Sequence, residues 1–331
     1  MEIEADFYEI PENQKVICQL CPAYCTLTEG KHGICQNRFN KNGKLYTNNF
    51  GEVVTLAIDP IEKKPLYHFL PSQQILSTGA NGCNFGCLNC QNWEISQQDV
   101  KTKYISPESL VQINKEKNCI GVAFTYTEPF IWFEYIFETV KLLKEENLAV
   151  VLVSNGYVNE KPLEKLLPYI DAINIDLKSI ETDFYKKICK AKLQPVLHTI
   201  KTVAQSDTHL ELTYLIIPEL NDTDAQIHKW VDFVAEQSEY IPIHFSAYFP
   251  DYKMENPATS KATLYNAVEI ARKTMKFVYV GNVKGSSFAD THCPACTNLV
   301  IHRDGYITDI VGLHGSHCTN CGFNLKIVQS L

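Results

Sequence analysis

Eleven of the thirteen cysteines in this chain fall into three groups along the sequence. The groups are Cys18, Cys21, Cys25 and Cys35; Cys83, Cys87 and Cys90; and Cys293, Cys296, Cys318 and Cys321. In a reducing compartment, cysteines grouped in this way indicate metal binding and not a disulfide framework. The remaining two, Cys119 and Cys189, stand alone, and we predict that they are core or surface thiols.

The middle group, Cys83, Cys87 and Cys90, has the spacing C-x3-C-x2-C within a loop rich in glycine and asparagine. Three thiolates on one loop can hold three irons of a [4Fe–4S] cluster, which usually has four protein thiolates. The fourth iron would then be open to a small-molecule ligand. A zinc knuckle or loose structural thiols are the alternatives, but zinc fits poorly because no fourth ligand lies nearby.

The two outer groups contain four cysteines each and predict two further metal sites. In the C-terminal group, two C-x2-C pairs are separated by residues 297–317, which is typical of a zinc ribbon or a rubredoxin-type site. Zinc is favoured there over iron, although both suit four thiolates. The N-terminal cysteines are irregularly spaced, so zinc, an auxiliary iron–sulfur cluster, and reduced structural or redox thiols all stay open.

The stretch between these outer groups alternates short apolar runs with amphipathic ones, which predicts about six βα units. The expected strands are 75–78, 120–125, 150–153, 172–175, 210–217, 241–245 and 277–280, and the expected helices are 130–147, 161–167, 181–189, 196–204, 224–239 and 263–275. Such alternation implies an α/β fold with parallel strands and right-handed crossovers. Six units are too few for a closed eight-fold barrel, whereas an open barrel and a doubly wound sheet both fit. In either architecture, ligands bind at the carboxyl ends of the strands.

Polar residues follow several of these predicted strands. They are Glu128, Ser154, Asn155, Asp176, Lys178 and His244. Alternation places Asp176 and Lys178 on the same face of a strand end, where they could bind a ligand or form an ordinary ion pair. Glu128 could instead favour the dipole of the helix that follows it. A lone histidine on a strand, such as His244, is more often simply buried and hydrogen-bonded.

The cysteine loop resembles the cluster loop of the radical S-adenosylmethionine (SAM) enzymes. In that superfamily SAM chelates the open iron through its amino and carboxylate groups. One electron from the cluster then cleaves SAM to methionine and a 5′-deoxyadenosyl radical, which abstracts a hydrogen atom. The resemblance implies a partial (β/α)6 TIM-like barrel that holds a [4Fe–4S] cluster and SAM.

The resemblance also implies roles for the polar residues at the strand ends. Glu128 would hydrogen-bond the SAM amino group, and the turn at Ser154 and Asn155 would approach the ribose. Asp176 and Lys178 would border the SAM carboxylate and sulfonium.

His244 occupies a position where activating-enzyme-like relatives often have a histidine near SAM. Two departures from the family pattern are visible in this chain. The glycines that usually precede the glutamate are replaced in Thr125-Tyr126-Thr127-Glu128-Pro129. Asn89 stands before the third cysteine, where an aromatic residue usually packs on the adenine.

Further motifs resemble a narrower family, the radical SAM member of the AmmeMemoRadiSam system, which is similar in its core to pyruvate formate-lyase activating enzymes. The motifs are Cys18-x2-Cys21-Pro22, Cys90-Gln91-Asn92-Trp93-Glu94-Ile95-Ser96, Tyr126-Thr127-Glu128-Pro129, His244-Phe245-Ser246-Ala247-Tyr248-Phe249-Pro250, Gly281-Asn282-Val283 and the paired C-terminal knuckles. Thr297 departs from the glycine that often follows the first knuckle. The resemblance implies Memo-like and Amme-domain partner proteins and an electron donor such as flavodoxin or ferredoxin.

Composition limits the remaining possibilities. The chain has 331 residues, of which 45% are apolar, and a net charge of −8 with a pI near 5.7. An acidic chain is a poor ligand for nucleic acid or an anionic membrane, and no apolar run approaches the roughly 20 residues of a membrane span. The acidic first six residues do not match a signal or transit peptide, so we expect a cytoplasmic protein.

These observations predict three parts: a Cys-rich N-terminal segment (1–72), a radical SAM partial barrel (73–285) and a zinc-ribbon or rubredoxin-like domain (286–331). The expected function is that of an enzyme which abstracts hydrogen from an unidentified substrate. That substrate could be a small molecule or the backbone of a partner protein, as in activation of a glycyl-radical enzyme. A metal-dependent scaffold or an electron-transfer protein is the alternative.

Overall fold

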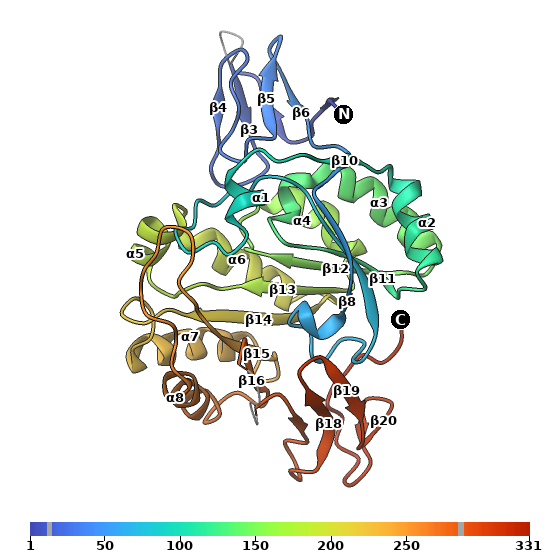
Figure 1. Ribbon diagram of the computed structural model, residues 1–331, viewed down its shortest axis with the longest axis vertical. Coiled ribbons are helices and arrows are strands. Elements are labelled where there is room, and N and C mark those ends of the chain that lie inside the picture. The colour runs from blue at the N-terminus through green and yellow to red at the C-terminus, as the bar shows by residue number, and fades with distance from the viewer. Residues whose placement is uncertain (12–14, 284–287) are drawn as a thin grey trace.

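The centre of the molecule is an open, eight-stranded mixed sheet in a computed structural model that describes residues 1–11, 15–283 and 288–331 (Figure 1). Its strand order is β16-β15-β14-β13-β12-β11-β9-β8. The strands are β8 (Thr55–Pro60), β9 (Gln74–Gly79), β11 (Gly121–Phe124), β12 (Ala149–Ser154), β13 (Ala172–Asp176), β14 (His209–Ile216), β15 (Ile243–Ala247) and β16 (Val278–Gly281). All neighbours from β9 to β16 pair in parallel, and β8 pairs antiparallel to β9. The predicted α/β architecture with parallel strands is therefore confirmed.

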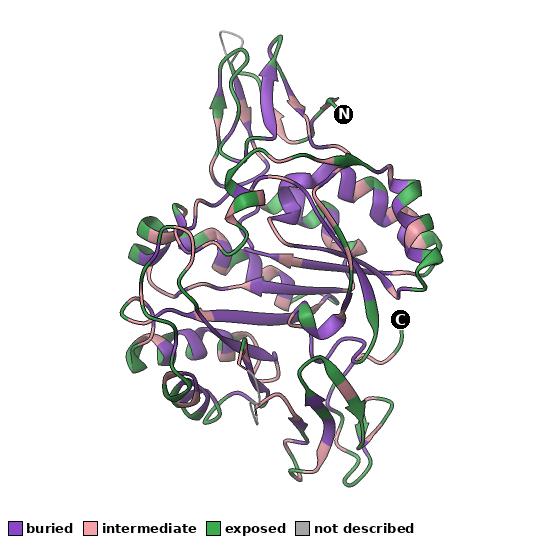
Figure 2. Cartoon of the chain, in the orientation of Figure 1, coloured by how far each residue is buried: buried purple, intermediate pink, exposed green. Residues whose placement is uncertain are grey.

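Helices connect the parallel strands as the alternating sequence predicts. They are α1 (Trp93–Gln97), α2 (Pro107–Glu116), α3 (Phe133–Glu145), α4 (Glu160–Leu166), α5 (Thr182–Phe184), α6 (Leu193–Ala204), α7 (Asp224–Gln237) and α8 (Lys261–Ala271). The longer helices expose one face and bury the other, whereas the central strands are mostly buried (Figure 2). Thr223 caps α7 and forms a capping box with Gln226. Asn221, two residues earlier, is buried and accepts a hydrogen bond from the Ile217 N–H.

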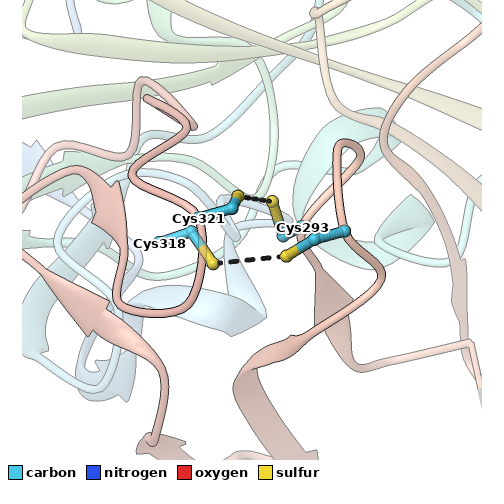
Figure 3. A group of neighbouring side chains, drawn as sticks. Cys293, Cys318 and Cys321 are labelled. Atoms are coloured by element: carbon cyan, nitrogen blue, oxygen red, sulfur yellow. Dashed lines mark hydrogen bonds between the residues drawn. The ribbon is translucent and has the colours of Figure 1, made fainter.

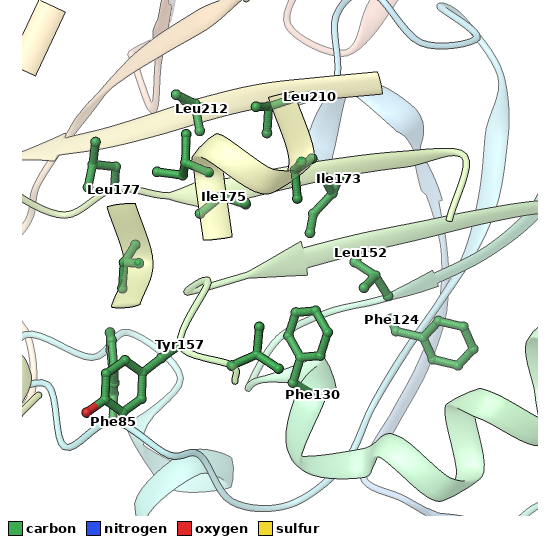
Figure 4. Packing of buried hydrophobic residues seen from close by; sticks show 14 of the residues in the cluster. Phe85, Phe124, Phe130, Leu152, Tyr157, Ile173, Ile175, Leu177, Leu210 and Leu212 are labelled. Atoms are coloured by element: carbon green, nitrogen blue, oxygen red, sulfur yellow. The ribbon is translucent and has the colours of Figure 1, made fainter. Parts of the chain in front are cut away.

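Side-chain alternation gives the two faces of the sheet different chemistry. Ile173 and Ile175 of β13 pack in the buried apolar cluster with Leu210 and Leu212 of β14 (Figure 4). Between them, Asn174 and Glu211 point to the opposite face, and both are fully buried. This polar face contacts the segment between β8 and β9.

The segment between β8 and β9 crosses that polar face. It begins with a short 3-10 helix, η1 (Ile61–Lys63). The side chain of Asn174 donates a hydrogen bond of 2.7 Å to the Pro65 carbonyl, and Glu211 accepts one of 2.7 Å from the His68 N–H. Strand β8 belongs to residues 1–72, the expected Cys-rich segment, and forms one edge of the central sheet.

The rest of the N-terminal part forms small antiparallel sheets beside the central sheet. Their strands are β1 (Ile3–Glu4), β2 (Tyr8–Glu9), β3 (Val16–Cys18), β4 (Thr26–Leu27), β5 (Arg38–Lys41), β6 (Lys44–Thr47), β7 (Glu52–Val53) and β10 (Lys103–Tyr104). A buried ion pair between Arg38 and Glu134 attaches them to α3. Since one partner alone would be an uncompensated buried charge, this pair fixes the position of the N-terminal part.

The C-terminal part is a small β-structure, as the sequence predicts. It contains β17 (Thr291–His292), β18 (Leu299–Asp304), β19 (Ile307–Ile310), β20 (Leu313–His314) and β21 (His317–Cys318). The Leu70 N–H donates to the Val328 carbonyl, so the end of the chain contacts the segment that crosses the sheet. The expected boundary at residues 285 and 286 lies outside the described residues. In the described parts of the chain, no helix has the length and apolarity needed to cross a bilayer.

Glu211 is the centre of the buried polar network inside the sheet. Its carboxylate accepts hydrogen bonds from His244 Nε2 at 2.6 Å and His209 Nε2 at 3.0 Å, in addition to the His68 N–H. Burial would raise the pKa of this carboxyl, but the two histidines outweigh burial and hold the pKa well below its usual range. The carboxylate therefore stays charged and joins β14, β15 and the crossing segment.

We expect Glu211→Gln to lower the free energy of unfolding by about 3 kcal/mol, because two histidines and a buried N–H lose their anionic acceptor. Urea unfolding at pH 7, followed by circular dichroism, measures this change. His209→Gln is the matched comparison. It should lower the free energy of unfolding by less, since His209 is only one of the three donors. Equal unfolding midpoints for Glu211→Gln and the wild type would contradict the central role of this carboxylate.

Candidate functional site

A cavity of about 420 Å³ lies at the carboxyl ends of the parallel strands. This volume is in the range of small-molecule sites. The cavity brings together seven of the residues that the sequence singled out: Cys83, Cys87, Cys90, Ser154, Asn155, Asp176 and Lys178. They come from the loops and ends of β9, β12 and β13, so segments distant in sequence meet at one edge of the sheet. Glu128 and His244 are not among the residues that line it.

The cysteine loop between β9 and α1 is fixed by hydrogen bonds from several parts of the molecule. Thr127 Oγ1 donates to the Ala80 carbonyl at 2.7 Å, and Asn84 Nδ2 donates to the Tyr157 carbonyl at 2.8 Å. Gly82 has φ +92°, and a Cβ there would lie 2.3 Å from the Cys35 carbonyl oxygen. Only glycine fits at this position, because the N-terminal part packs directly against the loop.

The three loop thiols are held in a largely buried, polar setting. Cys83 Sγ accepts from the Phe85 N–H at 3.4 Å and from Asn155 Nδ2 at 3.7 Å, and Cys90 Sγ lies 3.2 Å from Ser96 Oγ. Burial and the nearby Glu128 carboxylate raise the pKa of the Cys83 thiol. A bound metal would offset this cost, because its charge stabilises the thiolate. The donor set therefore suits an iron–sulfur cluster.

Cys189, which we predicted to be an ordinary core or surface thiol, lies beside this loop. It is fully buried at the end of η4 (Tyr185–Cys189), a π-helical turn, and its carbonyl accepts from the Gly86 N–H at 3.0 Å. A hydrogen bond between the two thiols lowers the pKa of Cys87, and burial raises that of Cys189. No spacing in the sequence links Cys189 to the loop, because the contact is made across about one hundred residues of chain.

Glu128 ties the ends of β11 and β12 together. Its Oε1 accepts from Ser154 Oγ at 2.8 Å and from the Phe130 N–H at 3.1 Å, and its Oε2 accepts from the Asn155 N–H at 2.8 Å. Burial raises the pKa of this carboxyl to about 7, even though these hydrogen bonds oppose the shift. Asn155 in turn donates to Asn84 Oδ1 at 2.8 Å. Glu128 is thereby linked to the cysteine loop through one side chain.

Asp176 and Lys178 both line the cavity, and they also pair with each other. Lys178 Nζ lies 2.9 Å from Asp176 Oδ2, and the two side chains are 22% and 37% exposed respectively. An ion pair that is open to a cavity can exchange its internal contact for contacts with a charged ligand. The same-face arrangement expected from strand alternation is therefore present.

His244 lies away from the cavity, in the Glu211 network. It is 2% exposed, and its ring stacks on that of Tyr279 at a centroid distance of 5.3 Å. His244 is near the start of β15, whereas the cavity is at the carboxyl ends of the strands. This position corresponds to the simpler expectation of a buried, hydrogen-bonded histidine.

The four C-terminal cysteines gather around one point (Figure 3). Cys293 Sγ lies 3.6 Å from Cys321 Sγ, Cys296 Sγ lies 3.7 Å from Cys318 Sγ, and all four sulfur atoms are within 4.8 Å of one another. Tetrahedral thiolates at a Zn–S distance of about 2.3 Å would be separated by about 3.8 Å. The group can therefore hold one metal ion.

The other two cysteine groups are less compact. Across the described ranges, the C-terminal group alone has three or more metal-ligating side chains gathered this tightly. A cluster of four irons spreads its thiolates more widely than a single ion does, so the wider spacing of Cys83, Cys87 and Cys90 is compatible with a cluster. For Cys18, Cys21, Cys25 and Cys35, the arrangement does not favour a single tetrahedral zinc.

The chain is similar to several known proteins. Residues 78–234 match the family model of the radical SAM superfamily. An uncharacterized protein of Methanocaldococcus jannaschii is 42% identical over 98% of this chain and 99% of the relative. Pyruvate formate-lyase 1-activating enzyme of Escherichia coli is 21% identical over 49% of this chain and 71% of that enzyme.

A solved structure shares the fold of the central sheet. The structure of Streptococcus suis SuiB bound to S-adenosylmethionine aligns with a TM-score of 0.51 at 14% sequence identity, covering 63% of this chain and 52% of that one. The matched family region includes the cysteine loop and the strand ends that form the cavity. The chain belongs to the radical SAM superfamily of enzymes.

Proposed function

We propose that this enzyme cleaves SAM reductively in the cavity and uses the resulting radical to abstract hydrogen from its substrate. Cys83, Cys87 and Cys90 would hold a [4Fe–4S] cluster with one iron open to SAM. When bound, the cluster supplies the electron that divides SAM into methionine and a 5′-deoxyadenosyl radical. The polar side chains at the ends of β12 and β13 would bind and orient SAM.

One observation carries this proposal: the three cysteines share one cavity with Ser154, Asn155, Asp176 and Lys178. Ligand and redox centre would therefore be in contact. Asn89 adds support, because its Oδ1 is buried at the cavity without a hydrogen-bond partner in the described structure. A buried acceptor of this kind is costly unless a ligand donates to it, and the SAM adenine carries such a donor.

Glu128 acts in this proposal as a positioning residue and not as a direct ligand. Two of its hydrogen bonds orient Ser154 and Asn155, and Asn155 reaches Cys83 and Asn84. The Glu128 side chain is buried and does not line the cavity, so the proposal includes no direct contact between its carboxylate and the SAM amino group. His244 has no part in the proposed SAM site, because it belongs to the Glu211 network.

The finer assignments rest on resemblance and on the cysteine groups. We propose a partial (β/α)6 barrel, an electron donor such as flavodoxin or ferredoxin, and partners of the Memo-like and Amme-domain types. Zinc at the C-terminal cysteines would have a structural role, since a domain of this size has little core of its own. The N-terminal cysteines would hold a metal or an auxiliary cluster. Activation of a glycyl-radical enzyme is the second candidate function, favoured by the similarity to pyruvate formate-lyase 1-activating enzyme.

SAM cleavage tests the proposed function directly. Anaerobically reconstituted, dithionite-reduced protein should form 5′-deoxyadenosine from SAM, measured by liquid chromatography and mass spectrometry. Cys87→Ala should abolish product formation, because it removes one of three cluster thiolates. Cys119→Ala is the matched control: this thiol is buried outside the cavity, and its loss should leave cleavage unchanged. Absence of product from the intact protein would refute the proposal.

The positioning role of Glu128 is tested by Glu128→Gln, which keeps the shape of the side chain but removes its charge. We expect SAM to bind about tenfold more weakly, in line with the loss of a charge-assisted hydrogen bond. The affinity is measured by titrating the reduced protein with SAM and following the change in the electron paramagnetic resonance signal of the cluster. This measurement does not depend on turnover. Unchanged SAM affinity and an unchanged signal would show that Glu128 does not position the site.

Metal analysis tests the assignment of the cysteine groups. A single cluster with zinc at the C-terminal site predicts about four iron, four sulfide and one zinc per chain. Cys318→Ser should lose the zinc and keep the iron. About eight iron per chain would instead make the N-terminal cysteines an auxiliary cluster, and loss of iron in Cys318→Ser would contradict zinc at the C-terminal site.

A further inference from the structure

One wall of the cavity carries two lysines that the proposed SAM site does not use. Lys63 and Lys64, at the end of η1, both line the cavity. Both amines donate to the same carboxylate: Lys63 Nζ lies 2.7 Å from Asp59 Oδ1, and Lys64 Nζ lies 2.8 Å from Asp59 Oδ2. Tyr126 Oη also donates to Asp59. The carboxylate is thus saturated with donors.

The charges on this wall do not balance. Two ammonium groups share one carboxylate, and Asp59 is not itself among the residues that line the cavity, whereas both lysines are. The other charged side chains of the lining, Asp176 and Lys178, form a pair of their own. Because two ammonium groups share a single carboxylate, this wall of the cavity has an excess of one positive charge, and a positive charge in a partly buried site favours an anionic ligand.

The position of the lysines favours a small ligand. They precede Pro65, which also lines the cavity and whose carbonyl is bound by Asn174, so the crossing segment forms this wall. The lining also includes the uncharged polar side chains of Thr213 and Ser246. A molecule bound to the lysines would therefore find further hydrogen-bonding groups in the same cavity.

We propose that Lys63 and Lys64 bind an oxyanion group, a carboxylate or a phosphate, on a small-molecule substrate. This binding would fix one end of the substrate and direct the carbon that loses hydrogen toward SAM. The assignment rests on the proposed function, since it concerns the substrate of that same site. The proposal favours a small anionic substrate over the backbone of a partner protein, because a peptide backbone carries no carboxylate or phosphate.

The test uses reconstituted holoprotein with SAM present, titrated calorimetrically at fixed ionic strength. Pyrophosphate and succinate are the anionic probes, and succinamide is the neutral counterpart of succinate. We expect at least one anionic probe to bind and succinamide not to bind, and the stronger of the two anions distinguishes phosphate from carboxylate. Fixed ionic strength is essential because salt screens exposed charges.

Lys63→Gln should weaken binding of the anionic probe about tenfold, as expected for loss of a charge-assisted contact. Lys63 is suited to substitution because its side chain is 44% exposed, whereas that of Lys64 is only 2% exposed. Lys63→Arg should restore binding. Lys187→Gln is the matched control, since Lys187 pairs with Asp183 on the surface. Lack of binding by both anions, or equal affinity in Lys63→Gln and the wild type, would overturn the proposal.

Formation of 5′-deoxyadenosine by the wild type, measured without either probe, separates this proposal from the proposed function. If cleavage occurs but no anion binds, the lysine site is refuted and the radical SAM activity stands. If no cleavage occurs, the proposed function is refuted together with the substrate role of the lysines, even where an anion binds to them.

Discussion

Parallel strands place all their carboxyl ends at one edge of a sheet, and the site in this protein depends on that constraint. The cysteine loop follows β9, the Glu128 turn follows β11, and the polar turns of Ser154 and Asp176 end the next two strands. Because neighbours in sequence are also neighbours in the sheet here, four consecutive connections converge on one cavity. No long loop is needed to bring the cysteine loop and the polar strand ends together.

Two buried carboxylates stabilise opposite ends of this arrangement. Glu128 binds the turns at the carboxyl ends, and Glu211 joins β14 and β15 to the segment that crosses the interior. Both charges would be costly in an apolar core, and both are compensated by several hydrogen-bond donors. The pKa values of the two carboxyls differ because Glu211 has two histidine partners, which keep its pKa low, whereas burial raises the pKa of Glu128 to about 7.

The parts outside the central sheet also contribute to the site. The N-terminal part contacts the cysteine loop at Gly82, where the Cys35 carbonyl leaves no room for a side chain. The C-terminal part contributes Tyr306 to the cavity, and its Arg303 donates to the Tyr67 carbonyl of the crossing segment at 2.8 Å. A metal that stabilises the C-terminal cysteines would therefore also stabilise one border of the cavity. Both outer parts thus contact the cysteine loop or the cavity that it lines.

The sequence by itself determined the α/β alternation, the three cysteine groups and the polar residues at the strand ends. These features depend on local periodicity and spacing, which can be seen along the chain. Only the tertiary structure decided that Glu128 orients its neighbours and that His244 lies in the Glu211 network. It also placed Cys189 beside Cys87 and Lys63 in the wall of the cavity. Such contacts join residues far apart in sequence. They depend on packing and on the pairing of buried charges, and neither leaves a local pattern in the amino-acid sequence.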